Sequence, residues 1–392
     1  MVHHDKIKDL NTPCILVDEK VVKNNCKSMI DRANQLGVDI RPHMKTHKTI
    51  EIGKYQVEGL KNQRVIVSTL SEAKFFTKAF KDILYAIPIS PNKISQAYEI
   101  HCEIDRLHLM IDHIDHITSL VNHIKQTNIN GKIWSVFLKI DCGYHRAGAN
   151  PESEETIRLV DLITHGEYSK YFEFQGIYSH SGHSYKCTTP QEIKKLAIQE
   201  ATVTGSFGKK LLACGYPCPN VSIGSTPVCC HLPDNLKDLG VTEIHPGNYV
   251  FYDLMQMELG NCSVDDVGVS VLTTVISVYP DRNEFLVDAG SLALSSDPGC
   301  THLAPNRPTP NFGIIVGHPN LRVLAVTQEI GKIVSTCDNS PIPFDHFKIG
   351  TKIRLIPNHS CLTAAMFSHF YVLDSHDDVN GELKSFVPNK HW

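Results

Sequence analysis

The stretch VDIRPHMKTHKT, residues 38–49, combines the end of a strand-like pattern with a lysine that stands between two histidines. Val38 and Ile40 alternate with polar neighbours, which is the pattern of a short β-strand. Pro42 interrupts this pattern, because proline lacks the N–H group that a strand ladder uses. Lys45 therefore follows directly on a predicted strand. Whether it is a solvated loop lysine or a reactive amine depends on the fold around this strand.

Eight strand-like runs of this kind recur along the chain, at residues 38–43, 64–69, 82–89, 106–112, 134–141, 172–180, 220–225 and 243–251. The first predicted helix starts after Asp18, a residue type that caps helices, and continues with apolar residues at helical spacing: Val22, Cys26, Met29, Ile30 and Ala33. Further helices are predicted over residues 71–80, 112–127, 152–165 and 190–213. Strands that alternate with helices predict a parallel sheet, and eight such units predict closure into a (β/α)8 TIM barrel.

The pattern changes after residue 255, where two β-rich runs surround a Pro-Asp-Arg-Asn turn at residues 280–283. More strand-like runs follow at residues 312–317, 321–335, 351–357 and 369–373, and helical periodicity is nearly absent. We therefore predict an α/β barrel domain over residues 1–255 and a C-terminal all-β domain over residues 256–392. The opening segment, residues 1–17, is expected either to join the β domain or to lead into the barrel.

The composition excludes several classes of partner. The chain has 392 residues and a formal net charge of -4, so it offers no electrostatic reason to bind nucleic acid or an anionic membrane. It contains no apolar run near the roughly 20 residues that a membrane span needs, and its first residues are too polar for a secretory signal. The 13 cysteines are an odd number scattered through a long chain, which is typical of reduced thiols in a cytoplasmic protein.

Polar segments follow several of the predicted strands, at residues 41–49, 141–148, 178–185, 222–227 and 245–249, and the last four contain glycine. A barrel gathers the C-terminal ends of its strands on one face, where barrel enzymes have their active sites. We therefore expect these segments to lie close together and to form one site.

The segment Ser222–Pro227 has the residues that a phosphate-binding loop needs. Gly224 permits close approach of the backbone to an anion, and the hydroxyl groups of Ser225 and Thr226 add donors. Taken alone, the segment is more typical of an ordinary turn. Together with a strand-end lysine it indicates a site for a phosphorylated aldehyde cofactor, because lysine forms a Schiff base with an aldehyde and the loop would anchor a phosphate. Pyridoxal 5'-phosphate needs both of these groups.

Five motifs together resemble a known group of enzymes: RPHMKTHKT at residues 41–49, DCGYHRAG at 141–148, GSTP at 224–227, HPGNYVFYD at 245–253 and PNHSC at 357–361. In this order they resemble the fold-type III pyridoxal-phosphate enzymes, which join an alanine-racemase-like barrel to a C-terminal β domain. Within that group the chain is similar to the eukaryotic D-serine dehydratase branch, which is related to D-threonine aldolase. The resemblance extends over nearly the whole chain.

The resemblance assigns roles to individual residues. It implies that Lys45 holds the cofactor as a Schiff base and that Arg146 approaches the cofactor's phenolic oxygen. Tyr178 and Tyr185 would line the site, although tyrosines packed in a barrel would show the same pattern. The phosphate end of the cofactor would be held by Gly224, Ser225, Thr226, Asn248 and Tyr249. Lys139 matches a racemase position that supports the arginine, but the catalytic tyrosine motif of racemases is not found, which argues against racemization.

His359 and Cys361 are the candidate metal ligands. On a strand, two residues at this spacing point to the same face, and imidazole nitrogen and thiolate are good zinc ligands. A buried cysteine beside a hydrogen-bonded histidine is the commoner reason for such a pair, but the resemblance favours zinc. A rival cluster has looser spacing and comprises Cys214, Cys218, Cys229, Cys230 and His231.

The reaction implied by the resemblance is conversion of D-serine to pyruvate and ammonia. Lys45 would also take the α-proton, and zinc would assist loss of the β-hydroxyl group. One alternative is a D-threonine aldolase-type retro-aldol cleavage on the same scaffold, and another is a non-catalytic carrier of pyridoxal phosphate. The resemblance also implies a homodimer with a small D-amino acid as its ligand.

Overall fold

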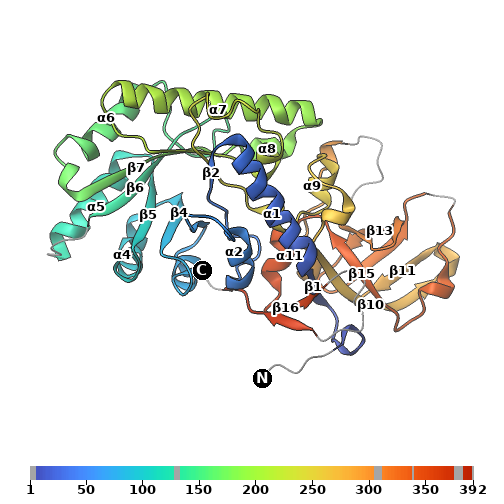
Figure 1. Cartoon of the computed structure of the whole chain (residues 1–392). Helices are drawn as coiled ribbons and strands as arrows, with labels where there is room; N and C mark the ends of the chain where they lie inside the picture. Colours follow the sequence, from blue (N-terminus) through green and yellow to red (C-terminus); the bar gives the residue numbers. More distant parts are fainter. Residues whose placement is uncertain (1–5, 128–132, 304–310, 338–339, 375–382, 391–392) are drawn as a thin grey trace. The chain divides into compact units, whose positions relative to one another are not determined.

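The computed structural model describes residues 6–127, 133–303, 311–337, 340–374 and 383–390 (Figure 1). These residues form two compact units. The barrel unit comprises residues 28–45 and 56–247, and the β unit comprises residues up to 27, 46–55 and 248–390. Across the described ranges, the structure contains no helix long and apolar enough to cross a bilayer.

The barrel unit contains eight parallel strands in the order β2-β9-β8-β7-β6-β5-β4-β3. Their bounds are β2 Asp39–Ile40, β3 Arg64–Val67, β4 Asp82–Pro88, β5 Arg106–Ile111, β6 Trp134–Lys139, β7 Phe172–Tyr178, β8 Asn220–Ile223 and β9 Glu243–Ile244. The two ends of this sheet meet through a parallel bridge between His43 and Ile66. Ile66 donates its N–H to the Pro42 carbonyl at 2.9 Å and accepts the Met44 N–H at 2.8 Å. All eight predicted strands and the barrel are therefore confirmed.

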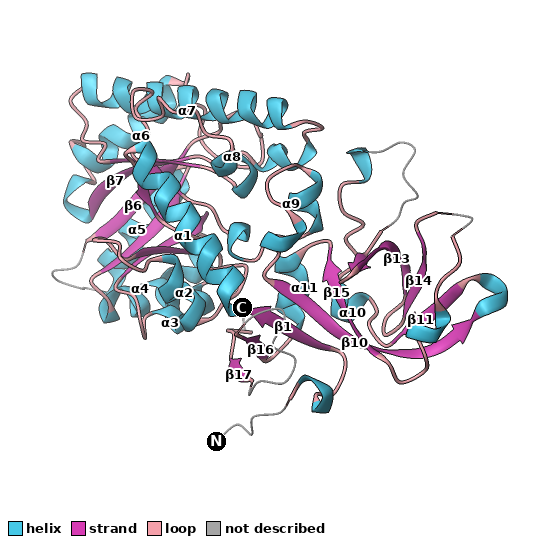
Figure 2. Ribbon diagram, turned by 45° about the vertical axis from the view of Figure 1, so that its right-hand side comes forward, coloured by secondary structure: helices cyan, strands magenta, loops and turns pink. Residues whose placement is uncertain are grey.

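The predicted helices are also present. In α1 (Glu19–Leu36), Oδ1 of Asp18 accepts the Val21 N–H at 2.8 Å, so the predicted cap is confirmed. The other predicted helices are α3 Leu70–Phe76, α5 Ile114–Thr127, α6 Glu154–Thr164 and α7 Pro190–Ala213. Other helices of the described residues were not predicted: α2 Ile50–Gln56, α4 Ile94–Glu103, α8 Thr226–Cys230, α9 Leu254–Glu258 and two short helices that accompany the second sheet. Figure 2 shows α4, α5, α6 and α7 on the outside of the barrel strands.

The β unit is built on a nine-stranded sheet in the order β11-β14-β13-β12-β15-β10-β1-β16-β17. The bounds are β1 Cys14–Asp18, β10 Val269–Tyr279, β11 Glu284–Val287, β12 Gly313–Ile315, β13 His318–Val326, β14 Gly331–Ser335, β15 Lys352–Pro357, β16 Phe370–Leu373 and β17 Lys384–Phe386. The opening segment contributes β1, which pairs antiparallel with β10 and parallel with β16. Two short helices, α10 Ser291–Leu294 and α11 Ser360–Met366, accompany the sheet.

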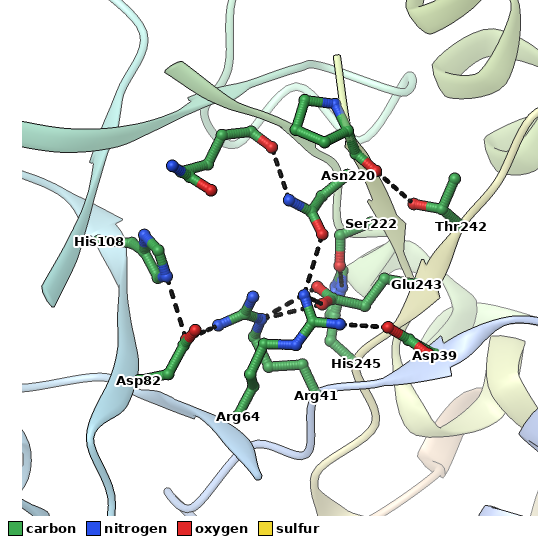
Figure 3. Close-up of polar contacts among 12 residues, drawn as sticks. Asp39, Arg41, Arg64, Asp82, His108, Asn220, Ser222, Thr242, Glu243 and His245 are labelled. Carbon is green, nitrogen blue, oxygen red and sulfur yellow. Dashed lines mark hydrogen bonds and ion pairs between the residues drawn. The ribbon is translucent and has the colours of Figure 1, made fainter. Parts of the chain in front are cut away.

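Buried ion pairs cross the interior of the barrel where several strands begin (Figure 3). The guanidinium of Arg41 donates to Glu243 at 3.0 Å and to Asp82 at 2.5 Å, and Nε2 of His108 lies 3.0 Å from the same Asp82 carboxylate. Asp82 and Glu243 are the first residues of β4 and β9. This ionic layer links strands that are distant in sequence. An apolar cluster occupies another part of the barrel: Ile66, Leu84, Ala86, Met110, Phe137 and Tyr178.

Candidate active site

Lys45 lies just beyond β2, as its sequence position predicts. Its backbone N–H donates to Nδ1 of His43 at 3.2 Å, and Nε2 of His43 lies 3.3 Å from Oγ of Ser68. Because Nδ1 accepts a hydrogen bond, the proton of neutral His43 is on Nε2 and is donated to Ser68. The hydrogen bonds of His43 therefore fix the turn that carries Lys45.

A cavity of about 290 Å³ opens beside Lys45. Its walls carry three cationic side chains, Lys45, Lys139 and Arg146, together with Tyr178 and apolar residues from the end of β4. None of the described residues that line it is acidic. A concave site with cations and no carboxylate is suited to a small anionic ligand. The structure therefore places Lys45, Arg146 and Tyr178, which the resemblance assigned to cofactor binding, around one cavity.

Burial controls the protonation states of the side chains that line this cavity. Loss of solvent, with the nearby charge of Arg146, lowers the pKa of Lys139 to about 8. Nζ of Lys139 donates to the Ala86 carbonyl at 3.4 Å and lies 5.1 Å from the ring centroid of Tyr178. Burial and the charge of Lys45 also lower the pKa of His43 and of His180 well below the ordinary value for histidine. Both imidazoles are therefore neutral near neutral pH.

The loop after β8, which is predicted to hold a phosphate, is tightly constrained. Gly224 has a φ of 136°, and an added Cβ would lie 2.7 Å from Sγ of Cys229, so only glycine fits. Oγ of Ser225 accepts the Val228 N–H at 3.4 Å and caps α8, as an ordinary turn serine would. Thr226 accepts the Gly247 N–H at 3.3 Å.

Two side chains hold this loop from other elements. Nδ1 of His180 donates to the Gly224 carbonyl at 2.7 Å, so the loop is joined to a wall of the cavity. Oε1 of Glu200 accepts the Gly224 N–H at 3.3 Å and the Ser179 hydroxyl at 2.7 Å. Glu200 lies on α7, and burial raises the pKa of its carboxyl group. These contacts fix the backbone of the loop before any ligand binds.

The remaining predicted cofactor residues occupy other places. Tyr185 lies in the 3-10 turn Gly182–Lys186 and is half-buried. Asn248 and Tyr249 begin the third segment of the β unit and are buried. Their expected share in holding the phosphate stays a prediction.

The predicted metal ligands lie at the start of a helix and not on a strand. His359 is the N-cap of α11 and Cys361 lies in its first turn, so the expectation that both lie on a strand is wrong. The carboxylate of Asp253 accepts the backbone N–H of Ser360 at 2.9 Å and its hydroxyl at 3.2 Å, which starts the helix here. The alternation of side chains along a strand therefore does not determine where these two side chains point.

Local contacts nevertheless orient the pair within the β unit. Nδ1 of His359 lies 2.8 Å from Oδ2 of Asp297 and donates its proton there, so a neutral imidazole would present Nε2 to a metal ion. Sγ of Cys361 lies 3.2 Å from Oγ1 of Thr46 and 3.6 Å from Nδ2 of Asn248. His359 and Cys361 also interact directly with each other. Imidazole and thiol thus face one another, as two ligands of one metal ion would.

No third candidate ligand joins this pair among the described residues. In the part of the chain that the structure describes, no group of three or more histidine, cysteine, aspartate or glutamate side chains is placed to hold a metal ion. The rival cluster of cysteines with His231 therefore has no metal-binding geometry. A site at His359 and Cys361 would leave coordination positions open, which is typical of catalytic zinc.

Several residues of these sites were not singled out from the sequence. His43, His180 and His245 lie inside the quoted strand-end segments, so the signal was present in the motifs. Glu200 and Asp297 lie on α7 and in a turn, far in sequence from the groups they contact. Only the tertiary structure reveals those contacts.

Comparison with known proteins agrees with a barrel followed by a C-terminal β domain. A family model for the alanine racemase N-terminal domain matches residues 17–254, and one for a serine dehydratase domain matches residues 268–373. D-serine dehydratase of Dictyostelium discoideum is 62% identical over 100% of this chain and 99% of its own length. D-serine dehydratase of Schizosaccharomyces pombe is 32% identical over 98% of this chain and 93% of its own.

Solved structures show the same fold. The structure of D-threo-3-hydroxyaspartate dehydratase from Delftia sp. HT23 has a TM-score of 0.88 at 29% identity and covers 99% of this chain and 100% of that one. Two further structures of a D-threo-3-hydroxyaspartate dehydratase carry a histidine-to-alanine and a cysteine-to-alanine substitution two positions apart, the latter in the metal-free form. This chain is thus an enzyme of the lyase class and belongs to the family of alanine-racemase-like proteins that contains the D-serine dehydratases.

Proposed function

We propose that this chain converts D-serine to pyruvate and ammonia with pyridoxal 5'-phosphate and zinc. The observation that carries the proposal is the cavity of the barrel unit, which is lined by Lys45, Lys139 and Arg146 and, among the described residues, by no acidic side chain. The names of the Dictyostelium and Schizosaccharomyces relatives support D-serine as the substrate.

The residues of the barrel unit fit the cofactor chemically. Lys45 offers a primary amine for an aldehyde, and Arg146 offers a cation for a phenolate. The Gly224 loop, where a side chain has no room, would let a phosphate approach the backbone closely. When bound, the cofactor's conjugated ring accepts the negative charge that develops at the substrate's α-carbon.

Lys45 would have two tasks in this reaction. Its Nζ would hold the cofactor at its aldehyde carbon while no substrate is bound. The released amine, held beside the cavity by the turn at His43, would then accept the proton from the α-carbon. Lys139 and Arg146 would keep the ligand's anionic groups in place.

His359 and Cys361 would hold the zinc ion, through Nε2 and Sγ. The hydrogen bond from Nδ1 of His359 to Asp297 supports this role, because a ligating histidine usually donates its other N–H to a carboxylate. The metal-free cysteine variant of a D-threo-3-hydroxyaspartate dehydratase supports it as well. A zinc ion supplies a Lewis acid for a poor oxygen leaving group such as hydroxide.

A panel of substrates tests the proposal. Purified protein loaded with pyridoxal phosphate should form pyruvate and ammonia from D-serine and not from L-serine. A chelator should abolish this activity, and zinc, but not magnesium, should restore it. Activity that survives chelation would remove the metal from the scheme.

The same panel separates the alternatives. Glycine and an aldehyde from D-threonine, without pyruvate from D-serine, would indicate a retro-aldol enzyme. Bound cofactor without turnover of any D-amino acid would indicate a carrier. The predicted homodimer is tested separately, by light scattering during size-exclusion chromatography.

A further inference from the structure

The cavity of the barrel unit holds one cationic side chain that is exposed to solvent, Arg146. Burial and then the charge of Arg146 lower the pKa of Lys139, so the two cations lie close enough to repel each other. None of the described residues that line the cavity is acidic, so no carboxylate of the wall offsets this repulsion. An arginine side chain in water adopts many rotamers. Arg146 therefore needs a specific contact to stay oriented toward the cavity.

The ring of Tyr144 supplies such a contact. Cζ of Arg146 lies 5.1 Å from the centroid of this ring, which is within the range of a cation–π interaction. Tyr144 and Arg146 are two residues apart in the segment that follows β6. A planar guanidinium stacks well on an aromatic face, which restricts its rotamers. The ring thus favours one orientation of the cation.

A second segment of the barrel unit fixes Tyr144 in turn. The imidazole of His183 stacks on its ring, with centroids 5.3 Å apart and planes inclined by 18°. A Cβ added to Gly182 would lie 2.8 Å from Cζ of the tyrosine, so the ring packs directly against the backbone of this turn. The contacts with His183 and Gly182 therefore determine where the ring of Tyr144 lies.

The backbone that carries both side chains is held by Asp141. Its Oδ1 accepts the N–H groups of Gly143 at 2.9 Å and of His145 at 3.0 Å. Its Oδ2 lies 2.7 Å from Nδ1 of His145. These contacts flank Tyr144 on both sides and end next to Arg146. The ring and the guanidinium are thus carried by a constrained turn.

We propose that Tyr144 is a positioning residue that holds the guanidinium of Arg146, through the face of its ring, in the orientation that meets the cofactor's phenolic oxygen. The inference rests on the proposed use of pyridoxal phosphate, in which Arg146 pairs with that oxygen. Tyr144 is not among the described residues that line the cavity, so it acts through the arginine. A cation oriented before the ligand arrives loses less entropy on binding, which raises cofactor affinity.

A double-mutant cycle on cofactor affinity tests this proposal. Wild type, Tyr144→Leu, Arg146→Gln and the double variant are titrated with pyridoxal phosphate, and Tyr144→Phe is the matched control that keeps the ring. Tyr144→Leu should weaken binding roughly three- to ten-fold beside Arg146 and not at all in the Arg146→Gln background. Tyr144→Phe should bind like wild type. Unchanged affinity in Tyr144→Leu, equal weakening in both backgrounds, or the same loss in Tyr144→Phe would overturn the proposal.

Nitrogen-15 relaxation of the Nε–H group of Arg146 gives a second readout, on protein without cofactor. The resonance is assigned by its absence from Arg146→Gln. Its order parameter should fall in Tyr144→Leu and not in Tyr144→Phe, because the leucine offers no aromatic face. Equal order parameters in wild type and Tyr144→Leu would contradict the proposal.

Gly182→Ala tests the same contact from the other segment, because its methyl group displaces the ring of Tyr144. If Tyr144→Leu does not fold, Gly182→Ala replaces it in both measurements and must give the same losses. Wild type that binds no cofactor would contradict the proposed function itself. The relaxation measurement still tests the contact between Tyr144 and Arg146 in that case, so the two failures are distinguishable.

Discussion

At the scale of single residues, the cavity contains two lysines with different surroundings. Lys45 lies on the turn after β2, whereas Lys139 ends β6 and is 4% exposed. A buried lysine without a carboxylate partner destabilises the protein near neutral pH, because the folded state holds a charge out of water. We infer that Lys139 is kept for ligand binding and not for stability.

The Lys139→Met variant should therefore be more stable than wild type when no ligand is bound. The pKa of Lys139 is about 8 in the folded state and about 10.4 in an unfolded chain, so between these values the unfolded state binds more protons. Wild-type stability should thus rise with pH from about 8, and the advantage of the variant, about 2 kcal/mol near pH 7, should shrink. Urea denaturation at several pH values measures this difference. A variant less stable than wild type near pH 7 would contradict the assignment.

Asp297 should determine the metal affinity of His359. Asp297→Asn weakens the acceptor for the His359 N–H, and loss of such a partner typically lowers metal affinity about 10- to 100-fold. Competition of zinc with a chromophoric chelator measures the affinity. Asp265→Asn, at an exposed position of the same unit, is the matched control and should bind zinc like wild type. Equal affinity in both variants would argue against zinc at this site.

At the scale of elements, the loop after β8 has no room for a side chain at Gly224. Gly224→Ala should place a methyl group 2.7 Å from Sγ of Cys229 and displace the backbone that faces the phosphate. We expect at least a ten-fold loss of cofactor affinity, measured by equilibrium dialysis. Gly215→Ala is a strict control, because Gly215 also has a positive φ, of 86°, but nothing lies within 4 Å of its added Cβ. It should lose about 1 kcal/mol of stability and no cofactor affinity.

The ionic layer of the barrel should make stability depend on pH. Burial raises the pKa of the Asp82 carboxyl, but the hydrogen bond from His108 and the charge of Arg41 outweigh it and hold that pKa well below its ordinary value. Asp82→Asn should cost about 2 kcal/mol near pH 7, less than a fully buried pair because the Asp82 side chain is 25% exposed. The contribution is present above about pH 4 and is lost as the pH falls toward the folded-state pKa. Denaturation of both proteins should therefore converge at low pH, and a constant difference would refute this assignment.

At the scale of the whole molecule, periodicity predicts most of the fold. All eight barrel strands follow from short apolar runs, even β2 and β9, which are two residues long. α2 was not predicted because Gly53 and two β-branched isoleucines in the segment Ile50–Gln56 weaken its helical propensity. The strand expected around Cys361 was wrong because the Asp253 carboxylate, more than a hundred residues earlier in the sequence, starts a helix at Ser360. Contacts of this kind leave no periodic signal in the sequence.

The central claim is a covalent bond between Nζ of Lys45 and pyridoxal phosphate, and chemical trapping tests it most directly. The holoenzyme is reduced with borohydride, digested and examined by mass spectrometry, with Lys139→Met treated in parallel. The account predicts that both proteins carry the reduced cofactor on the peptide that contains Lys45. An unmodified Lys45, or a label on Lys139 in the wild type, would contradict it.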